Sequence, residues 1–299
     1  MLGFLQKLLT NRLSYPTLSS REKQRFKKIY KKLDEHYPSG EDAWGLNLEH
    51  AKKTLEMVYP IYRRYFRVRT FGAEYIENRP YMVIANHSGQ IAIDGMLICT
   101  SFITEIDPPR ILRPMVERFF TGLPFLGQMA AEGGSVLGDR QNCIQLMERG
   151  ESVLVFPEGV KGVAKSRPDY YKLQPFTRGF YRLSIATGVP ILPVAVVGAE
   201  EFYPYVYQLQ SVAKALGLPA LPISPNYFPL PSPVDIHIGE PIYPPEGLYQ
   251  DSLDKDIAEE VYRVEKQIKD MISYGLEKRR SFWSNIENTY KKKEGKSHE

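Results

Sequence analysis

A histidine and an aspartate lie close together in the first third of this 299-residue chain. His87 follows Asn86 at the end of the apolar run 81–85, and Asp94 lies about one helical turn into the next predicted element. A neutral imidazole can accept a proton as a general base, and a carboxylate can orient the ring and stabilise the imidazolium that forms. The pattern therefore fits acid–base chemistry, although a histidine with a purely structural role would leave the same pattern.

A second polar segment follows another strand-sized run. The run 152–156 (SVLVF) leads directly into 157–162 (PEGVKG), which places Glu158 and Lys161 just beyond a buried strand. Taken alone, this string also fits a simple turn. Ligand sites of parallel sheets lie beyond the carboxyl ends of the strands, so the polar residues of these two segments are the first candidates for a site.

Short apolar runs alternate with segments of helical periodicity over most of the chain. Strands are predicted at 81–85, 111–116, 135–137, 152–156, 190–197 and 234–238, and helices at 91–103, 125–131, 141–149, 176–187 and 251–274. This alternation predicts an α/β fold with a largely parallel central sheet flanked by helices, preceded by an N-terminal helical region. The Pro-rich segment 218–233 is expected to be an ordered excursion that borders an apolar groove.

Four segments, in order, resemble the blocks of the glycerol-3-phosphate / 1-acylglycerol-3-phosphate acyltransferase (lysophospholipid acyltransferase) superfamily. In that family four residues separate the histidine from the aspartate, whereas six separate His87 from Asp94. A longer turn at 88–90 is expected to absorb the difference. The four segments are Asn86-His87 with Asp94, Gly134-Ser135-Val136-Leu137-Gly138-Asp139-Arg140, Phe156-Pro157-Glu158-Gly159-Val160-Lys161, and Val189-Pro190-Ile191-Leu192-Pro193-Val194.

The resemblance implies an enzyme that moves a fatty acyl chain from a thioester to a glycerolipid hydroxyl. His87 would take the hydroxyl proton as the oxygen attacks the thioester, and Asp94 would orient His87 and balance its new charge. The tetrahedral oxyanion needs hydrogen-bond donors, for which the backbone amides around Glu158 and Gly159 are candidates. No covalent acyl-enzyme is required, because the acceptor itself attacks the thioester.

The resemblance also implies a set of substrate-binding residues. Arg140 and Lys161 would supply positive charge to the acceptor, and Lys161 replaces an arginine of the family, which removes the bidentate fork. Glu158 would hydrogen-bond a glycerol hydroxyl or brace the site, and Gly159 belongs to the same block. Arg113 lies in a stretch where family members often carry a basic residue.

The identities of the two substrates are left open by the sequence. The donor is expected to be acyl-CoA or acyl carrier protein, and the acceptor a glycerolipid such as lysophosphatidate or monoacylglycerol. The pair Val160-Lys161, in place of Thr-Arg, also resembles the branch that acylates neutral mono- and diacylglycerols. Two other functions compete: an acyl thioesterase or lipid hydrolase in which His87 and Asp94 activate water, and a non-catalytic lipid-binding protein on the same fold.

No cofactor or metal is expected, because the remaining histidines show no metal-ligand spacing with each other. They are His36, His50, His237 and His298. Nucleic-acid binding is not expected either, since the basic ends contain no recognisable nucleic-acid-binding motif. The two cysteines provide no disulfide framework, which fits a reducing cytosol.

Charge is spread unevenly and suggests a membrane surface as a partner. Residues 1–70 carry 15 Lys/Arg against 7 Asp/Glu, and residues 276–299 carry 7 against 4. Basic ends attract anionic headgroups, and no run approaches the length of a membrane span. A solvated helix face would carry the same charges, but the lipid acceptor that the resemblance implies favours a membrane surface. We therefore expect a basic amphipathic, membrane-facing region (1–70), an acyltransferase domain (71–250), and a C-terminal helix with a basic tail (251–299). The protein is expected to be cytoplasmic and peripherally membrane-associated, with no cleavable signal peptide.

Overall fold

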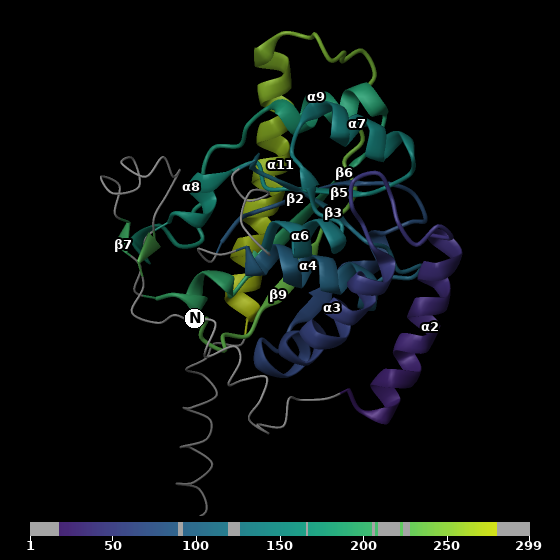
Figure 1. Cartoon of the computed structure of the whole chain (residues 1–299). Helices are drawn as coiled ribbons and strands as arrows, with labels where there is room; N and C mark the ends of the chain where they lie inside the picture. Colours follow the sequence, from purple (N-terminus) through teal and green to yellow (C-terminus); the bar gives the residue numbers. More distant parts are fainter. Residues whose placement is uncertain are drawn as a thin grey trace, which may run out of the picture.

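The computed structural model describes residues 18–88, 92–118, 126–165, 167–204, 207–208, 222–223 and 228–279 (Figure 1). The predicted amphipathic segment at the start of the chain, half of the Pro-rich segment and the basic tail beyond residue 279 lie outside these residues.

A seven-stranded sheet forms the centre of the molecule, in the order β1-β9-β6-β2-β5-β3-β4. Every neighbouring pair is parallel except β6 and β9, which are antiparallel. The predicted α/β class with a largely parallel sheet is therefore confirmed. The strands are β1 (Arg69–Phe71), β2 (Met82–Ala85), β3 (Arg113–Val116), β4 (Val136–Leu137), β5 (Val153–Val155), β6 (Ile191–Val197) and β9 (Asp235–Ile238). A separate pair consists of β7 (Tyr207–Gln208) and β8 (Pro222–Ile223).

Alternate residues of the central strands point into two different apolar cores. Val83 and Ala85 of β2 belong to a core with the first helices of the chain, whereas Met82 and Ile84 belong to a core with the later helices. All residues of β2, β6 and β9 are buried. Strands covered on both faces read as continuous apolar runs, which is why the sequence shows them so clearly.

Helices cover both faces of the sheet (Figure 1). One core includes residues of α2 (Ser20–His36), α3 (Leu48–Pro60) and α4 (Ile93–Thr104), and the other includes residues of α7 (Arg140–Glu148), α9 (Gly179–Thr187) and α11 (Asp254–Lys278). Two shorter helices, α6 (Leu126–Glu132) and α8 (Val160–Val163), follow β3 and β5. Single turns lie at Ile61–Tyr65, Ala73–Tyr75, Arg167–Asp169 and Ala199–Phe202.

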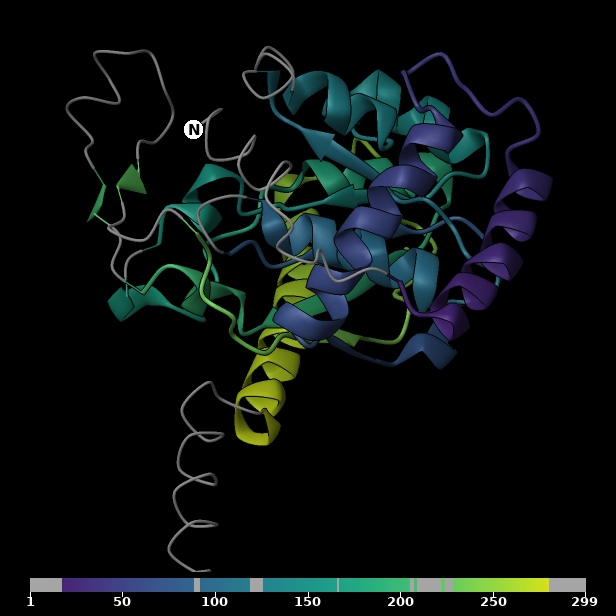
Figure 2. The same ribbon diagram turned by 60° about the horizontal axis from the view of Figure 1, so that its bottom comes forward.

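The basic segment near the N-terminus forms helix α2, which packs on the body of the protein. Its start is fixed by a capping box in which Ser19 and Glu22 bond each other's backbone amides. Phe26, Ile29 and Leu33 recur at helical spacing and are buried in the first core. Figure 2 shows α2 (purple) at the edge of the molecule, well away from α11 (yellow). The apolar face of α2 is thus covered by the protein itself.

Most predicted elements are present with ends shifted by a few residues, and one strand of the seven-stranded sheet was not predicted. β1 spans Arg69–Phe71, across the boundary predicted at residue 70, so the sheet begins earlier than expected. Arg69 binds Asp235 of the neighbouring strand with two hydrogen bonds of 2.7 and 2.5 Å. α9 ends as predicted before Gly188, whose φ of +67° forms a left-handed cap. Within the described ranges, no helix combines the length and apolarity needed to cross a bilayer.

Candidate active site

The site begins where β2 ends, and a buried asparagine determines how the chain leaves the sheet. The side chain of Asn86 donates to the carbonyl of Val196 (3.0 Å) and accepts from the amide of the same residue (2.7 Å). The asparagine thereby takes the place of a further pair of strand hydrogen bonds between β2 and β6. The next residue, His87, is the first free to turn out of the sheet, at its carboxyl edge.

His87 and Asp94 meet despite the longer interval between them. The Nδ1 atom of His87 lies 2.8 Å from Oδ2 of Asp94, which also accepts the amide of Ser88 at 2.7 Å. The other oxygen, Oδ1, accepts the amide of Gly95 at 2.8 Å. Asp94 is the second residue of α4, so the start of this helix positions the carboxylate. A carboxylate facing Nδ1 keeps the proton on that nitrogen and leaves Nε2 as the basic atom.

Burial differs between the two partners in the way a general base requires. The side chain of Asp94 is fully buried, whereas His87 keeps 13% of its side chain exposed. Phe156 fixes the plane of the imidazole, because its ring stacks on that of His87 with centroids 4.0 Å apart and planes 14° apart. The carboxylate and the phenyl ring together hold the imidazole by its edge and its face.

The turn after β5 packs directly against His87 and depends on glycine. A Cβ added to Gly162 would lie 2.8 Å from Cβ of His87 and 2.9 Å from Cβ of Glu158. Contacts this short are essentially absent from proteins, so the turn can approach the histidine only because residue 162 has no side chain. Gly159 adopts φ +56°, also a glycine conformation, and its amide bonds the carbonyl of Phe156 at 3.0 Å. That amide is therefore already occupied and does not serve as the expected oxyanion donor in this conformation.

Glu158 is held by protein groups on both of its carboxylate oxygens. One oxygen, Oε1, accepts the backbone amide of His87 at 2.8 Å. The other oxygen, Oε2, accepts the amide of Gln174 at 2.7 Å and lies 3.0 Å from Nζ of Lys165. The side chain is completely buried. These contacts are those of a bracing residue, and the expected bond to a glycerol hydroxyl stays a prediction.

Lys165 was not predicted from the sequence, yet it lies in the centre of this brace. Its ammonium group is buried and contacts Glu158, Glu200 at 3.3 Å and the backbone carbonyl of His87 at 3.3 Å. Burial raises the pKa of Glu200 to about 7, and the lysine opposes this rise. The sequence contained only an indirect signal, since Glu200 stands just after the apolar strand β6.

Arg113, which was expected to bind substrate, lies in the interior of the protein. The side chain is fully buried. Its guanidinium lies 2.5 Å from Asp42 and 2.8 Å from the carbonyl of Gly134, and it faces the ring of Trp44. These contacts join the loop before α3 to β3 in the interior, and the buried Nη2 atom of Arg113 has no hydrogen-bond partner among the described residues.

Arg140 and Lys161 are both exposed, but the structure does not bring Arg140 next to the histidine. Arg140 is the first residue of α7, which Asp139 caps by accepting the amide of Asn142 at 2.8 Å. β4, which precedes it, is three strands from β2, or roughly 14 Å across the sheet. Its guanidinium binds the side chain of Gln250. Substrate binding by Arg140 and Lys161 remains a prediction.

Neither a metal nor a cysteine is indicated as part of the chemistry. Among the residues that the structure describes, no group of three or more His, Cys, Asp or Glu is arranged to hold a metal ion. Burial raises the pKa of Cys99 to about 12 and that of Cys143 to about 11. Thiols with such pKa values are almost never ionised near neutral pH, so they are poor nucleophiles.

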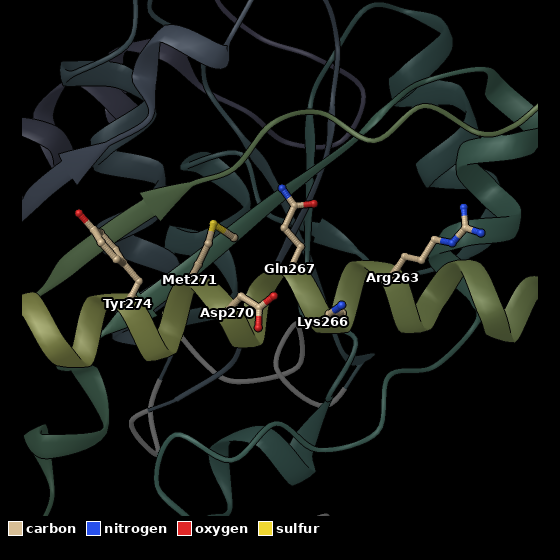
Figure 3. A pocket seen from close by; sticks show the side chains of 6 residues that line it. All are labelled: Arg263, Lys266, Gln267, Asp270, Met271 and Tyr274. Atoms are coloured by element: carbon tan, nitrogen blue, oxygen red, sulfur yellow. The ribbon is translucent and has the colours of Figure 1, made fainter.

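A hollow on the outer side of α11 is separate from this site. Figure 3 shows that side chains of one helix line it, with Tyr274 and Arg263 at its two ends. Its other lining residues are Lys266, Gln267, Asp270 and Met271. None of the predicted site residues lines the hollow.

Comparisons with known proteins agree with the fold and with the resemblance seen in the sequence. Residues 67–197 match the family model described as Acyltransferase. A crystal structure of the 1-acyl-sn-glycerophosphate (LPA) acyltransferase from Thermotoga maritima aligns with a TM-score of 0.50 and 19% identity, over 93% of this chain and 89% of that one. This likeness concerns the fold.

Curated relatives extend the match at the level of sequence. An uncharacterized protein of Mycobacterium leprae is 32% identical over 228 residues, which cover 72% of this chain and 60% of the relative. The human 1-acyl-sn-glycerol-3-phosphate acyltransferase alpha is 27% identical over 172 residues, covering 53% of this chain and 56% of the relative. The chain thus spans little more than half the length of these relatives. The match over residues 67–197 and the four sequence blocks make this part of the chain similar to acyltransferases, and the fold agrees with that similarity.

Proposed function

We propose that the protein is an O-acyltransferase that transfers a fatty acyl chain from an acyl thioester to the hydroxyl of a glycerolipid. The observation that carries the proposal is the contact between Nδ1 of His87 and a buried carboxylate, with the ring held at the carboxyl edge of the sheet and still accessible. The names of the human and Thermotoga relatives make lysophosphatidate the first acceptor to test.

The proposed reaction needs no bond between the protein and the acyl group. Nε2 of His87 accepts the proton of the acceptor hydroxyl while the oxygen attacks the carbonyl carbon of the thioester. The tetrahedral intermediate collapses with loss of the thiolate, and the imidazolium returns its proton to the leaving sulfur. Asp94 stabilises the imidazolium in between, because it is buried and faces the ring at 2.8 Å.

Thiol release from a long-chain acyl-CoA by the purified protein tests this proposal. The donor is given with no acceptor, with lysophosphatidate, with glycerol-3-phosphate or with monoacylglycerol, each beside His87→Ala. Release that requires one acceptor and disappears in His87→Ala is expected, and it names the acceptor. Release without an acceptor would instead indicate a thioesterase. A folded protein that releases no thiol, also with an acyl carrier protein as donor, would favour lipid binding without catalysis.

We further propose that the protein is a peripheral membrane protein of the cytoplasm, held by its basic N-terminal region. Arg21, Lys23, Lys27, Lys28 and Lys31 are exposed on α2, while the apolar face of the helix is buried in the core. Deleting residues 1–70 would remove part of this core, so a charge reversal is the better test. Lys27→Glu with Lys28→Glu is expected to weaken co-sedimentation with phosphatidylglycerol vesicles and leave the melting temperature unchanged. Equal sedimentation of the double variant and the wild-type protein would refute the proposed binding of the N-terminal region to the membrane.

A further inference from the structure

Three charged side chains, those of Lys165, Glu158 and Glu200, form a buried network that reaches the backbone of His87. The proposed chemistry does not use them directly. Lys165 is 5% exposed, Glu158 4% and Glu200 3%. The ammonium of Lys165 lies 3.0 Å from one carboxylate and 3.3 Å from the other. Burying an ammonium is expensive even when it is paired, and a well-packed apolar side chain is often as stable. An interior lysine in this place therefore calls for an explanation beyond stability.

The lysine and one of the glutamates hold both polar groups of the same backbone residue. Glu158 accepts the amide of His87 at 2.8 Å, and Lys165 donates to the carbonyl of His87 at 3.3 Å. Glu158 and Lys165 are themselves joined through the ion pair. The backbone of the histidine is thus fixed from both sides by one pair of side chains, independently of the contacts that Asp94 and Phe156 make with its ring.

Glu200 holds the lysine in its turn. Its Oε1 contacts Lys165, and its Oε2 accepts the amide of Tyr171. Glu200 stands just after β6, whereas Glu158 stands just after β5, on the other side of β2. Lys165 therefore connects the carboxyl ends of the two strands that flank the strand carrying His87. A shift of either neighbour would be transmitted to the histidine through this single ammonium group.

We propose that Lys165 is a positioning residue for the acyl transfer, which fixes the backbone of His87 and thereby the place of Nε2. This inference rests on the proposed function for its kinetic consequences. Glu158 acts with Lys165 as the second half of the clamp, and Glu200 holds the ammonium group in place. A base displaced by about 1 Å from its productive position can lose about a hundredfold in rate.

The decisive variant is Lys165→Met, which keeps an unbranched side chain one atom shorter than lysine and removes the charge. We expect kcat to fall by about 10- to 100-fold, while KM for the acceptor changes less than threefold, since the lysine does not face the substrate. Lys172→Met is the matched control, because Lys172 is an exposed lysine of the same segment paired with Asp169. It should keep the wild-type kcat.

A second variant separates positioning from simple stability. Lys165→Met alone leaves two buried carboxylates without a counter-charge, so it will lower the melting temperature. Combining it with Glu200→Gln removes one of these charges, and part of the lost thermal stability is expected to return. The kcat is expected to stay low, because the carbonyl of His87 remains unheld. A kcat that recovers together with the melting temperature would overturn the inference, as would a folded Lys165→Met enzyme with kcat within twofold of wild type.

A spectroscopic measurement tests the inference without any activity. In protein labelled with ¹⁵N-histidine, the ring signals of His87, assigned by their loss in His87→Ala, are expected to shift or broaden in Lys165→Met and to stay unchanged in Lys172→Met. Unchanged His87 signals in a folded Lys165→Met protein would refute the positioning role. If the wild-type protein has no transferase activity but Lys165→Met still shifts the ring signals of His87, the proposed function is refuted and the positioning of His87 by Lys165 is supported.

Discussion

Replacing Asp94 by asparagine should abolish most of the activity while leaving the size of the side chain unchanged. The carboxylate accepts three hydrogen bonds, from Nδ1 of His87 and from the amides of Ser88 and Gly95. An asparagine has one acceptor oxygen and one donor nitrogen. If the oxygen keeps the bond to Gly95, the NH₂ group faces both the amide of Ser88 and the imidazole. The imidazole must then accept a hydrogen bond at Nδ1 and carry its proton on Nε2. A protonated Nε2 cannot act as the base.

The expected size of the effect follows from this change of tautomer. Loss of the orienting carboxylate in a histidine–aspartate pair costs about 10⁴-fold in kcat. We therefore expect Asp94→Asn to lower kcat by about 10³- to 10⁴-fold, equivalent to about 4–5.5 kcal/mol in the activation free energy. The opposed donors at Ser88 would also lower the free energy of unfolding by about 1–3 kcal/mol.

The assay is acceptor-dependent thiol release at saturating acyl-CoA, with urea unfolding measured on the same preparations. Asp34→Asn is the matched control, because Asp34 is an exposed carboxylate of α2 and should keep the full rate. A folded Asp94→Asn protein that retains more than a tenth of the wild-type kcat would refute the assignment of Asp94 as the group that orients His87.

Three further predictions concern Arg113, Gly162 and His237. Arg113→Met should lower the free energy of unfolding by about 3–5 kcal/mol, because it leaves Asp42 without its buried partner; a stable variant with a raised KM would instead restore the substrate-binding role. Gly162→Ala should lower kcat at least tenfold, since the new methyl group would overlap the Cβ of His87; a wild-type rate in a folded variant would argue against the close approach. Burial lowers the pKa of His237 below its ordinary 6.5, so the folded state binds fewer protons than the unfolded state near and below that pH. The neutral, buried His237 therefore contributes its full share to the free energy of unfolding above about pH 6.5, and this contribution is lost as the pH falls. The urea midpoint of His237→Phe should accordingly depend less on pH between 6.5 and 5 than that of the wild-type protein.

The sequence predicted the fold well where local patterns coincide with burial on both faces. β2, β5 and β6 were predicted to within a residue or two, because strands covered on both faces have few polar positions to interrupt them. β1 was missed because it is short and lies at the edge of the sheet, where its residues are only partly buried or exposed. Its place is decided by pairing with β9, which lies 166 positions further along the chain.

The candidate site was likewise predicted in part from the sequence and missed in part. The pairing of His87 with Asp94 was expected from residue types and order, and the structure brings the two together in spite of the longer interval. Lys165 was missed, and Arg113 was expected at the substrate but lies buried in the interior. A lysine or arginine in a sequence looks like a surface residue or a ligand-binding residue, and only its surroundings in three dimensions show that it is buried in a network of ion pairs.

The sequence by itself determined the class of the fold, the order of its strands and helices, and the residue types that meet at the carboxyl edge. These follow from local apolar periodicity and from the order of four short blocks. The tertiary structure alone decided which polar side chains are accessible and which are internal supports. Burial and pairing are properties of strands that are far apart in the chain, such as β5 and β6 on either side of β2, and no local pattern records which carboxylate will face which ammonium group.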